Sequence, residues 1–181
     1  MILDAETLAL TPGVEQLVSW AEGRELPGVL KMELLASMVE LATDVCGSAA
    51  EALDAAVALR ACAVEAAREN GLVLAAAGTH AFSVPTAQQI APDPRYREFV
   101  EYAGVSARRQ AVCGLHVHVG MPGPDECMVA LEGVLAWLPV VSVLRRSCFL
   151  GCSAPPLANW TPLMLIPACP VCLTSHPKPA A

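Results

Sequence analysis

Two histidines stand one residue apart in the stretch AVCGLHVHVG, residues 111–120. Apolar and polar residues alternate here, which predicts a β-strand whose successive side chains point to opposite faces. His116 and His118 would then share one face, close enough to hold a common ligand. Neutral imidazole coordinates divalent metals and protonated imidazole binds phosphate oxygens, so the pair suits a metal-nucleotide site. A surface pair without function fits the same spacing, and the motif alone does not separate the two.

Two carboxylates, Glu33 and Glu40, form a second candidate group. The surrounding segment 28–42 has apolar residues at mixed helical spacing and predicts a helix, although its stretch 38–41 also fits a strand. On a helix, residues seven apart lie about two turns apart on one face, here directly before Thr43. Carboxylate oxygens are ligands that Mg²⁺ prefers. Two acids at this spacing also occur on an ordinary solvated helix face.

Polar residues at the ends of other expected elements are further candidates. Gly78, Thr79 and His80 end an apolar stretch, 71–79, that predicts a strand, and a glycine there lets a ligand approach the backbone closely. A plain exit from strand to loop explains these residues almost as well. Three arginines suit bidentate binding of carboxylate or phosphate, or simple solvation near helix ends. They are Arg95, Arg108 and Arg109.

The cysteine spacing near the carboxyl end mimics a zinc ribbon. Cys148 and Cys152 precede Cys169 and Cys172, with His176 as a spare ligand. The intervening residues lack the glycine and polar residues of a knuckle turn, so zinc binding is the weaker interpretation. The remaining cysteines are expected to be small buried residues in a reducing compartment. They are Cys46, Cys62, Cys113 and Cys127.

The elements that must position these groups begin with residues 2–10, which predict a strand broken by a polar turn, with only two or three residues before the turn. A helix is expected within 12–22. The clearest helix covers 48–70, where Ser48 and Glu51 form a capping box and Asn70-Gly71 supplies the stop. Its expected buried face consists of Leu53, Val57, Ala61 and Val64.

A loop at 85–94 leads to a helix that opens at Asp93-Pro94 and carries Phe99 and Tyr102. The resulting order of helices and half-polar strands predicts an α+β domain built on a largely antiparallel sheet.

Composition supports one folded domain followed by a different tail. The chain has 181 residues, 55% of them apolar, and a net charge of -7, which argues against nucleic-acid binding because phosphate contacts need clustered Lys and Arg. Every acidic residue lies at or before Glu132. The shift toward proline and cysteine beyond it predicts a domain over 1–141 and an irregular tail over 142–181.

The amino terminus shows no secretory signal, so a cytoplasmic location is expected. The only candidate for a membrane span, 127–144, contains Glu132 and Pro139, and a span needs about 20 uninterrupted apolar residues. We therefore expect a buried amphipathic helix over 127–144 and no membrane partner.

Four segments taken together resemble the carboxylate-amine ligases of the glutamate-cysteine ligase type 2 family. They are ELLASMVELATDVC, LAAAGTHAFS, DPRYREFVEYAG and RRQAVCGLHVHVGMPGPDE, and the resemblance covers about residues 2–141. It implies a fold similar to glutamine synthetase, in which an antiparallel sheet forms a funnel. There ATP phosphorylates a carboxylate and an amine displaces phosphate. The implied substrates are glutamate and cysteine or another amine, and the implied product is γ-glutamylcysteine.

The resemblance also implies roles for individual residues. Glu40 and Glu33 would hold Mg²⁺, while His116 and His118 would face the nucleotide phosphates, so that Glu40 and both histidines are the expected catalytic groups. Five residues would bind the substrates: Thr43, Thr79, His80, Arg95 and Arg109.

The sequence also departs from the family pattern. An acidic V-E-x-E motif of the first strand is absent, Ala81 replaces a usual proline, and VLRRSCFLGCSAPP follows WLPVV where the family continues S-A-N-S-P. We therefore expect an incomplete ligase. As a hypothesis, the tail results from reading the gene out of frame. The alternative is a non-catalytic remnant or interaction domain that pairs through a sheet edge and the helix at 124–138. A homo-oligomer is compatible with either.

Overall fold

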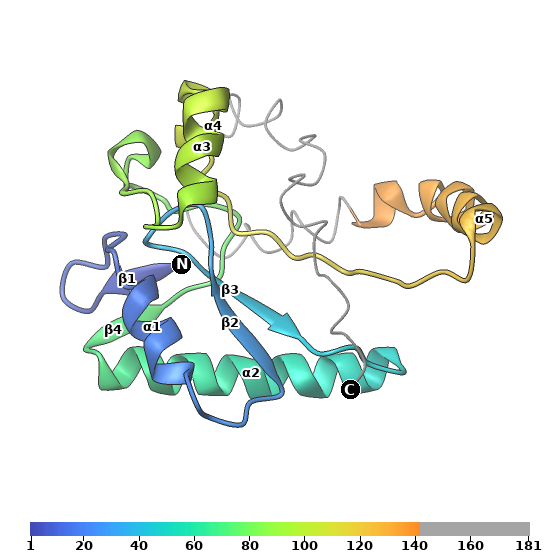
Figure 1. Cartoon of the computed structure of the whole chain (residues 1–181), viewed down its shortest axis with the longest axis horizontal. Coiled ribbons are helices and arrows are strands. Elements are labelled where there is room, and N and C mark those ends of the chain that lie inside the picture. Colours follow the sequence, from blue (N-terminus) through green and yellow to red (C-terminus); the bar gives the residue numbers. More distant parts are fainter. Residues whose placement is uncertain (142–181) are drawn as a thin grey trace. The chain divides into compact units, whose positions relative to one another are not determined.

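Two small antiparallel sheets organise the first half of the chain in the computed structural model, which describes residues 1–141. β1 (Ile2–Asp4) pairs with β4 (Leu72–Leu74), and β2 (Gly28–Met32) pairs with β3 (Val39–Thr43). Helices pack beside these strands, as Figure 1 shows, so the α+β prediction is confirmed.

The helix predicted over 28–42 is wrong, because this segment forms β2 and β3. In β2, the side chains alternate between buried and exposed, with Leu30 buried and Val29 and Lys31 exposed. That period of two is the signature of a half-buried strand. The alternative for 38–41, a strand, is the correct one. The connection between β2 and β3 is buried over residues 34–38. Within it, the hydroxyl of Ser37 donates to the side-chain oxygen of Gln88 at 3.1 Å.

The short first strand and the following helix are confirmed. The Asp4 carboxylate closes the predicted turn by accepting hydrogen bonds from the backbone N–H and hydroxyl of Thr7, and Leu10 returns to bridge Leu3. α1 (Val14–Ala21) buries Val14 and Leu17.

α2 (Ala49–Glu69) begins and ends as predicted. The Ser48 hydroxyl accepts from the backbone N–H of Glu51, and Gly71 adopts a left-handed φ of 68° after the helix. The Glu51 carboxylate accepts from the backbone N–H of Gly47 rather than that of Ser48, so the capping box is shifted by one residue.

The predicted buried face of α2 is wrong. Leu53, Val57 and Val64 are more than half exposed, and Ala61 is exposed too. The buried residues are Leu59, Ala63, Ala66 and Ala67. α2 packs against β3, β4 and α1 through this alanine-rich stripe (Figure 1), because small side chains allow the closest approach of backbones. The larger apolar residues had suggested the opposite face.

Three helices follow the loop that contains the short 3₁₀ turn η1 (Pro85–Ala87). They are α3 (Pro94–Ala103), α4 (Val105–Arg108) and α5 (Pro124–Leu135). Asp93 caps α3 as predicted, since its carboxylate accepts from the backbone N–H of Arg95. The buried residues of α3 are Tyr96 and Val100, whereas Tyr102 is 92% exposed.

Two strand predictions are only partly correct. The stretch 71–79 is a strand only at Leu72–Leu74, and 111–120 makes a single bridge, from Val112 to Thr79, beside a hydrogen bond from the Cys113 N–H to the Gly78 carbonyl. A strand needs a continuous ladder of backbone hydrogen bonds. Within the described region of the chain, no ladder continues past Val112, and Leu115 and Val117 are therefore exposed.

The helix predicted near 124–138 is confirmed as α5, but its expected burial is wrong, because α5 has no buried residue. No helix within residues 1–141 is long and apolar enough to span a membrane. The four cysteines expected to be buried are half-buried or, at Cys127, exposed, and all four are free thiols. The predicted irregular tail and the zinc ligands Cys148, Cys152, Cys169, Cys172 and His176 lie outside the described residues.

Candidate functional site

The two candidate carboxylates come together at one end of the β2–β3 ladder. Met32 pairs with Val39 as the last pair of the ladder, Glu33 follows Met32, and Glu40 lies opposite Lys31. The sequence predicted the two carboxylates along one helix, whereas they lie on or beside two paired strands. Adjacent antiparallel strands hold side chains at a fixed spacing that a flexible loop would not give.

The electrostatics distinguish Glu33, whose carboxyl group is partly removed from water. Burial raises the pKa of Glu33, a hydrogen bond from the backbone N–H of Leu34 opposes this, and the negative charge of Glu40 raises that pKa further. Half-buried anions that repel each other are stabilised by a nearby cation.

Tyr96 of α3 is the third member of this cluster. Its side chain is buried, and its hydroxyl donates a hydrogen bond of 2.7 Å to the carbonyl oxygen of Met32. Burial, together with the charges of Glu33 and Glu40, raises the pKa of Tyr96 to about 12. The sequence reasoning missed Tyr96, although its spacing of four residues from Val100 on a helix that opens at Asp93 indicated the buried face.

His116 brings the fourth segment to the cluster. Its positive form lowers the pKa of Glu33 through charge attraction. The rings of His116 and His118 lie near one another, with centroids 6.4 Å apart and planes at 87°. Both side chains are exposed on the extended segment after Val112. We name Glu33, Glu40, Tyr96 and His116 the carboxylate cluster.

Thr79 and His80 are engaged in contacts that shape the chain. The Thr79 hydroxyl donates to the carbonyl of Ala111 at 2.8 Å. The Nδ1 of His80 accepts from the N–H of Ser83, which leaves its Nε2 protonated to donate to the Leu8 carbonyl at 3.0 Å. The Thr79 hydrogen bond and the bridge from Thr79 to Val112 bring the GTH segment and residues 111–113 side by side, whereas His80 contacts the loop after β1.

The remaining predicted binding residues lie at the ends of elements. Thr43 is the exposed last residue of β3, and Arg109 follows α4 as its C-terminal cap. The Arg95 guanidinium binds the Asp93 carboxylate at 2.7 Å and lies 5.8 Å from the centre of the Tyr96 ring. Arg95 is thus adjacent to the carboxylate cluster, with most of its side chain exposed.

The donor set of the cluster fits Mg²⁺ better than zinc. Within residues 1–141, no group of three or more His, Cys, Asp or Glu side chains is arranged to hold a metal ion. Zinc needs such a set, whereas Mg²⁺ keeps several waters and binds through one or two carboxylates and substrate phosphates. Glu33 and Glu40 are two carboxylates of the kind that such a site needs.

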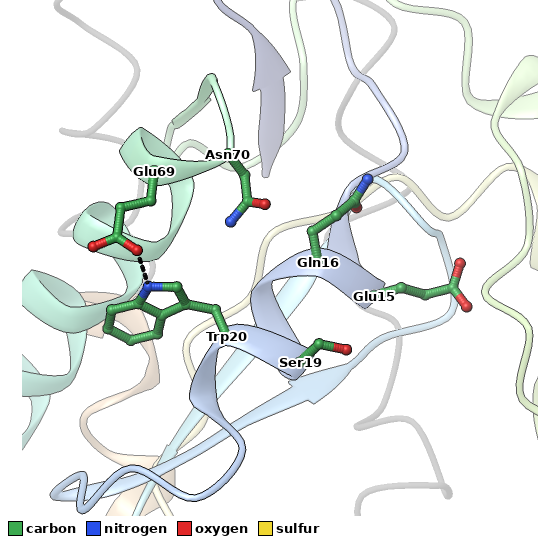
Figure 2. A pocket seen from close by; sticks show the side chains of 6 residues that line it. All are labelled: Glu15, Gln16, Ser19, Trp20, Glu69 and Asn70. Carbon is green, nitrogen blue, oxygen red and sulfur yellow. Dashed lines mark hydrogen bonds between the residues drawn. The ribbon is translucent and has the colours of Figure 1, made fainter.

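An open surface hollow of about 700 Å³ between α1 and the end of α2 holds none of the predicted site residues. Figure 2 shows the Trp20 indole pointing toward Glu69, to whose carboxylate it donates a hydrogen bond of 2.6 Å. The Arg24 guanidinium stacks on the Trp20 ring, 3.9 Å from its centre. The hydrogen bond between Trp20 and Glu69 links α1 to α2, and the hollow lies beside it.

Comparison with known proteins identifies related chains. The relative from Rubrobacter xylanophilus, named "Putative glutamate--cysteine ligase 2-3", is 39% identical over 146 residues, which are 81% of this chain and 40% of the relative. The relative from Azoarcus sp., named "Putative glutamate--cysteine ligase 2", is 33% identical over 138 residues, 76% of this chain and 37% of that one. The chain spans about two fifths of the length of these relatives.

The family model of glutamate-cysteine ligase family 2 matches residues 8–144. This range contains every member of the carboxylate cluster and the GTH segment. Because the match covers well over half of the chain, the protein belongs to glutamate-cysteine ligase family 2.

Proposed function

We propose that this chain carries a portion of the site of an ATP-dependent carboxylate-amine ligase with a fold similar to glutamine synthetase. The observation that carries the proposal is the carboxylate cluster, which brings four segments of the family match to one charged site. The relatives are named for glutamate and cysteine, so these are the proposed substrates, with γ-glutamylcysteine as product.

The proposed ligase reaction has two steps, phosphoryl transfer and amide formation. A carboxylate oxygen of glutamate attacks the γ-phosphorus of ATP, the bond to the bridging oxygen breaks, and ADP leaves. The amine of cysteine then attacks the acyl carbon, loses a proton, and expels inorganic phosphate. Bound Mg²⁺ would supply neutralisation of the charge on the transferred phosphoryl group.

Each residue has a role in this proposal that follows from its chemistry. Glu33 and Glu40 hold Mg²⁺ with their carboxylate oxygens, and the exposed imidazoles of His116 and His118 contact phosphate oxygens when protonated. Glu40 and the two histidines are the proposed catalytic groups. The proposed substrate-binding residues are Thr43, Thr79, His80, Arg95 and Arg109.

Arg95 and Asp93 already form an ion pair, so an arriving substrate carboxylate would have to compete with Asp93 for the guanidinium. A cytoplasmic location is part of this proposal, since ATP is available there.

Trapping the acyl phosphate tests the proposal with the full chain. Hydroxylamine in place of cysteine converts an acyl phosphate to a hydroxamate, which is measured together with ADP. We expect hydroxamate that requires both glutamate and Mg-ATP and that falls at least about tenfold in Glu40→Gln. The exposed Glu98→Gln serves as the matched control. ADP and hydroxamate at the level of a blank without protein would contradict a catalytic role for this chain.

A second candidate, an interaction domain without turnover, is favoured by one observation. Leu115, Val117 and Val119 are each at least 68% exposed on an extended segment that forms no strand ladder within residues 1–141. Exposed alternating apolar residues are typical of surfaces that bind another polypeptide. Binding of Mg-ATP without ADP formation would favour an incomplete ligase, and the absence of nucleotide binding would favour the interaction domain.

A further inference from the structure

Tyr96 lies where α3 meets the end of the β2–β3 ladder. Its side chain is only 7% exposed, and Val100 is the next buried residue of the same helix. The other tyrosine of the chain, Tyr102, stands on the same helix but is 92% exposed. Two tyrosines on one helix thus have opposite environments, and only Tyr96 reaches the carboxylate cluster.

The hydroxyl of Tyr96 acts on the backbone beside Glu33. It donates to the carbonyl oxygen of Met32 at 2.7 Å, the residue immediately before Glu33. Met32 and Val39 are the last pair of the ladder, so strand pairing stops supporting the backbone at this point. The hydrogen bond from Tyr96, on α3, holds the backbone at Met32, where the ladder ends.

The start of α3 is itself held firmly. The Asp93 carboxylate accepts from the backbone N–H of Arg95 at 2.9 Å and binds its guanidinium, while Pro94 fixes the first helical position. Tyr96 therefore extends from a capped first turn. A side chain on such a turn is a better anchor than one on a loop.

The charge state of Tyr96 suits this task. A phenol is neutral near pH 7 and is therefore a hydrogen-bond donor, and the raised pKa of Tyr96, about 12, extends this state to higher pH. A neutral phenol also adds no charge to the two carboxylates, so their negative charge stays available for a cation.

We propose that Tyr96 is a positioning residue for a divalent cation held by Glu33 and Glu40, because its hydroxyl anchors the Met32 carbonyl and thereby fixes the spacing of the two carboxylates. This inference rests on the metal site of the proposed function. Tyr96 itself does not contact the cation. Removal of the hydroxyl leaves the backbone before Glu33 free to move. Binding of the cation must then also restrict the two carboxylates, which lowers the affinity of the chain for the cation.

The test measures Mn²⁺ binding to the full chain, with Mn²⁺ as the probe for Mg²⁺. Free Mn²⁺ is followed by electron paramagnetic resonance at a temperature where each variant gives a folded circular-dichroism spectrum. Tyr96→Phe removes only the hydroxyl, and Tyr102→Phe is the matched control on the same helix. We expect Tyr96→Phe to weaken Mn²⁺ binding about tenfold, the lower end for residues that orient metal ligands, and Tyr102→Phe to leave it unchanged.

The outcomes separate the inference from the function on which it rests. Mn²⁺ binding that is lost in Glu33→Gln but equal in the wild-type chain and Tyr96→Phe would overturn the role of Tyr96 and keep the metal site. A wild-type chain that binds no Mn²⁺, or binds it equally with Glu33→Gln, would overturn both.

A second measurement applies if Tyr96→Phe does not fold. In the wild-type chain labelled with ¹³C-tyrosine, the two ring signals are assigned with Tyr102→Phe. Mn²⁺ should broaden the Tyr96 signal more strongly than the Tyr102 signal, because Tyr102 lies about 9 Å further along the helix. An unbroadened Tyr96 signal at saturating Mn²⁺ would place the cation elsewhere and overturn the inference.

Discussion

Glu33 is a half-buried carboxyl group whose pKa is raised, first by burial and then by the charge of Glu40. Its folded-state pKa lies above the ordinary value of 4.5, so the folded chain binds this proton more tightly than the unfolded chain does. The free energy of unfolding therefore decreases as the pH rises from the ordinary value through the folded-state pKa. Above that range, ionised Glu33 destabilises the fold until a cation arrives.

Glu33→Gln carries an amide that cannot ionise, so its stability should depend less on pH. The variant should lose less stability than the wild-type chain between pH 4.5 and neutrality, because it lacks the buried charge. Thermal unfolding at several pH values without divalent cations measures this, with the exposed Glu98→Gln as control. Parallel pH curves for wild type and Glu33→Gln would show that the carboxyl is not destabilised by its site.

At the residue scale, the sequence was enough to select Glu33 and Glu40 as candidate metal ligands, but it did not point to Tyr96. Glu33 and Glu40 were selected because Mg²⁺ prefers carboxylate ligands, and that reasoning needs no fold. Tyr96 was missed because a buried tyrosine has no chemical signature in a sequence. Its importance depends on the Met32 carbonyl, which only tertiary structure brings within 2.7 Å.

At the element scale, local signals were reliable where backbone chemistry decides and unreliable where packing decides. The ends of α2 and the start of α3 follow from Ser48, Gly71 and Asp93, whose hydrogen bonds or conformation are local. The segment 28–42 was misjudged because short apolar runs fit a helix or a strand. Its two strands are selected by pairing with each other.

The N-terminal cap of α2 yields a direct prediction. Ser48→Ala removes the acceptor for the Glu51 N–H and should lower the free energy of unfolding by about 1 kcal/mol. Ser48→Asp restores an acceptor and should recover most of the loss. Urea unfolding followed by circular dichroism measures both. Equal midpoints for wild type and Ser48→Ala would show that the cap contributes nothing to the stability of the chain.

The strand pair that carries the carboxylates depends on Gly28. Its φ is 147°, and a Cβ atom at this position would lie 2.3 Å from the carbonyl oxygen of Ala42. Gly28→Ala should therefore lower the free energy of unfolding by about 1–3 kcal/mol. Gly133→Ala is the control, since open space surrounds that position. Unchanged stability in Gly28→Ala would mean that β2 and β3 are not paired in this register.

At the scale of the whole molecule, apolar side chains remain exposed on α5 and on the segment that carries the histidines. Both elements lie within the family match, while the chain spans about two fifths of its relatives. The sequence correctly predicted the family and the α+β class, because the types and order of the motifs can be recognised without knowing how they pack. The burial of α5 was mispredicted, since a pattern shows which face is apolar but not what covers it.

Thermal unfolding of the full chain with and without Mg-ATP tests the central claim, that residues 1–141 retain a metal-nucleotide site. A ligand that binds only the folded state stabilises it by about 2.7 kcal/mol at a concentration of 100 times its Kd. We predict a cooperative transition that Mg-ATP moves to higher temperature in the wild-type chain and moves much less in Glu40→Gln. A midpoint that stays the same at saturating Mg-ATP, or moves equally in both proteins, would contradict the assignment of the carboxylate cluster as the metal-nucleotide site.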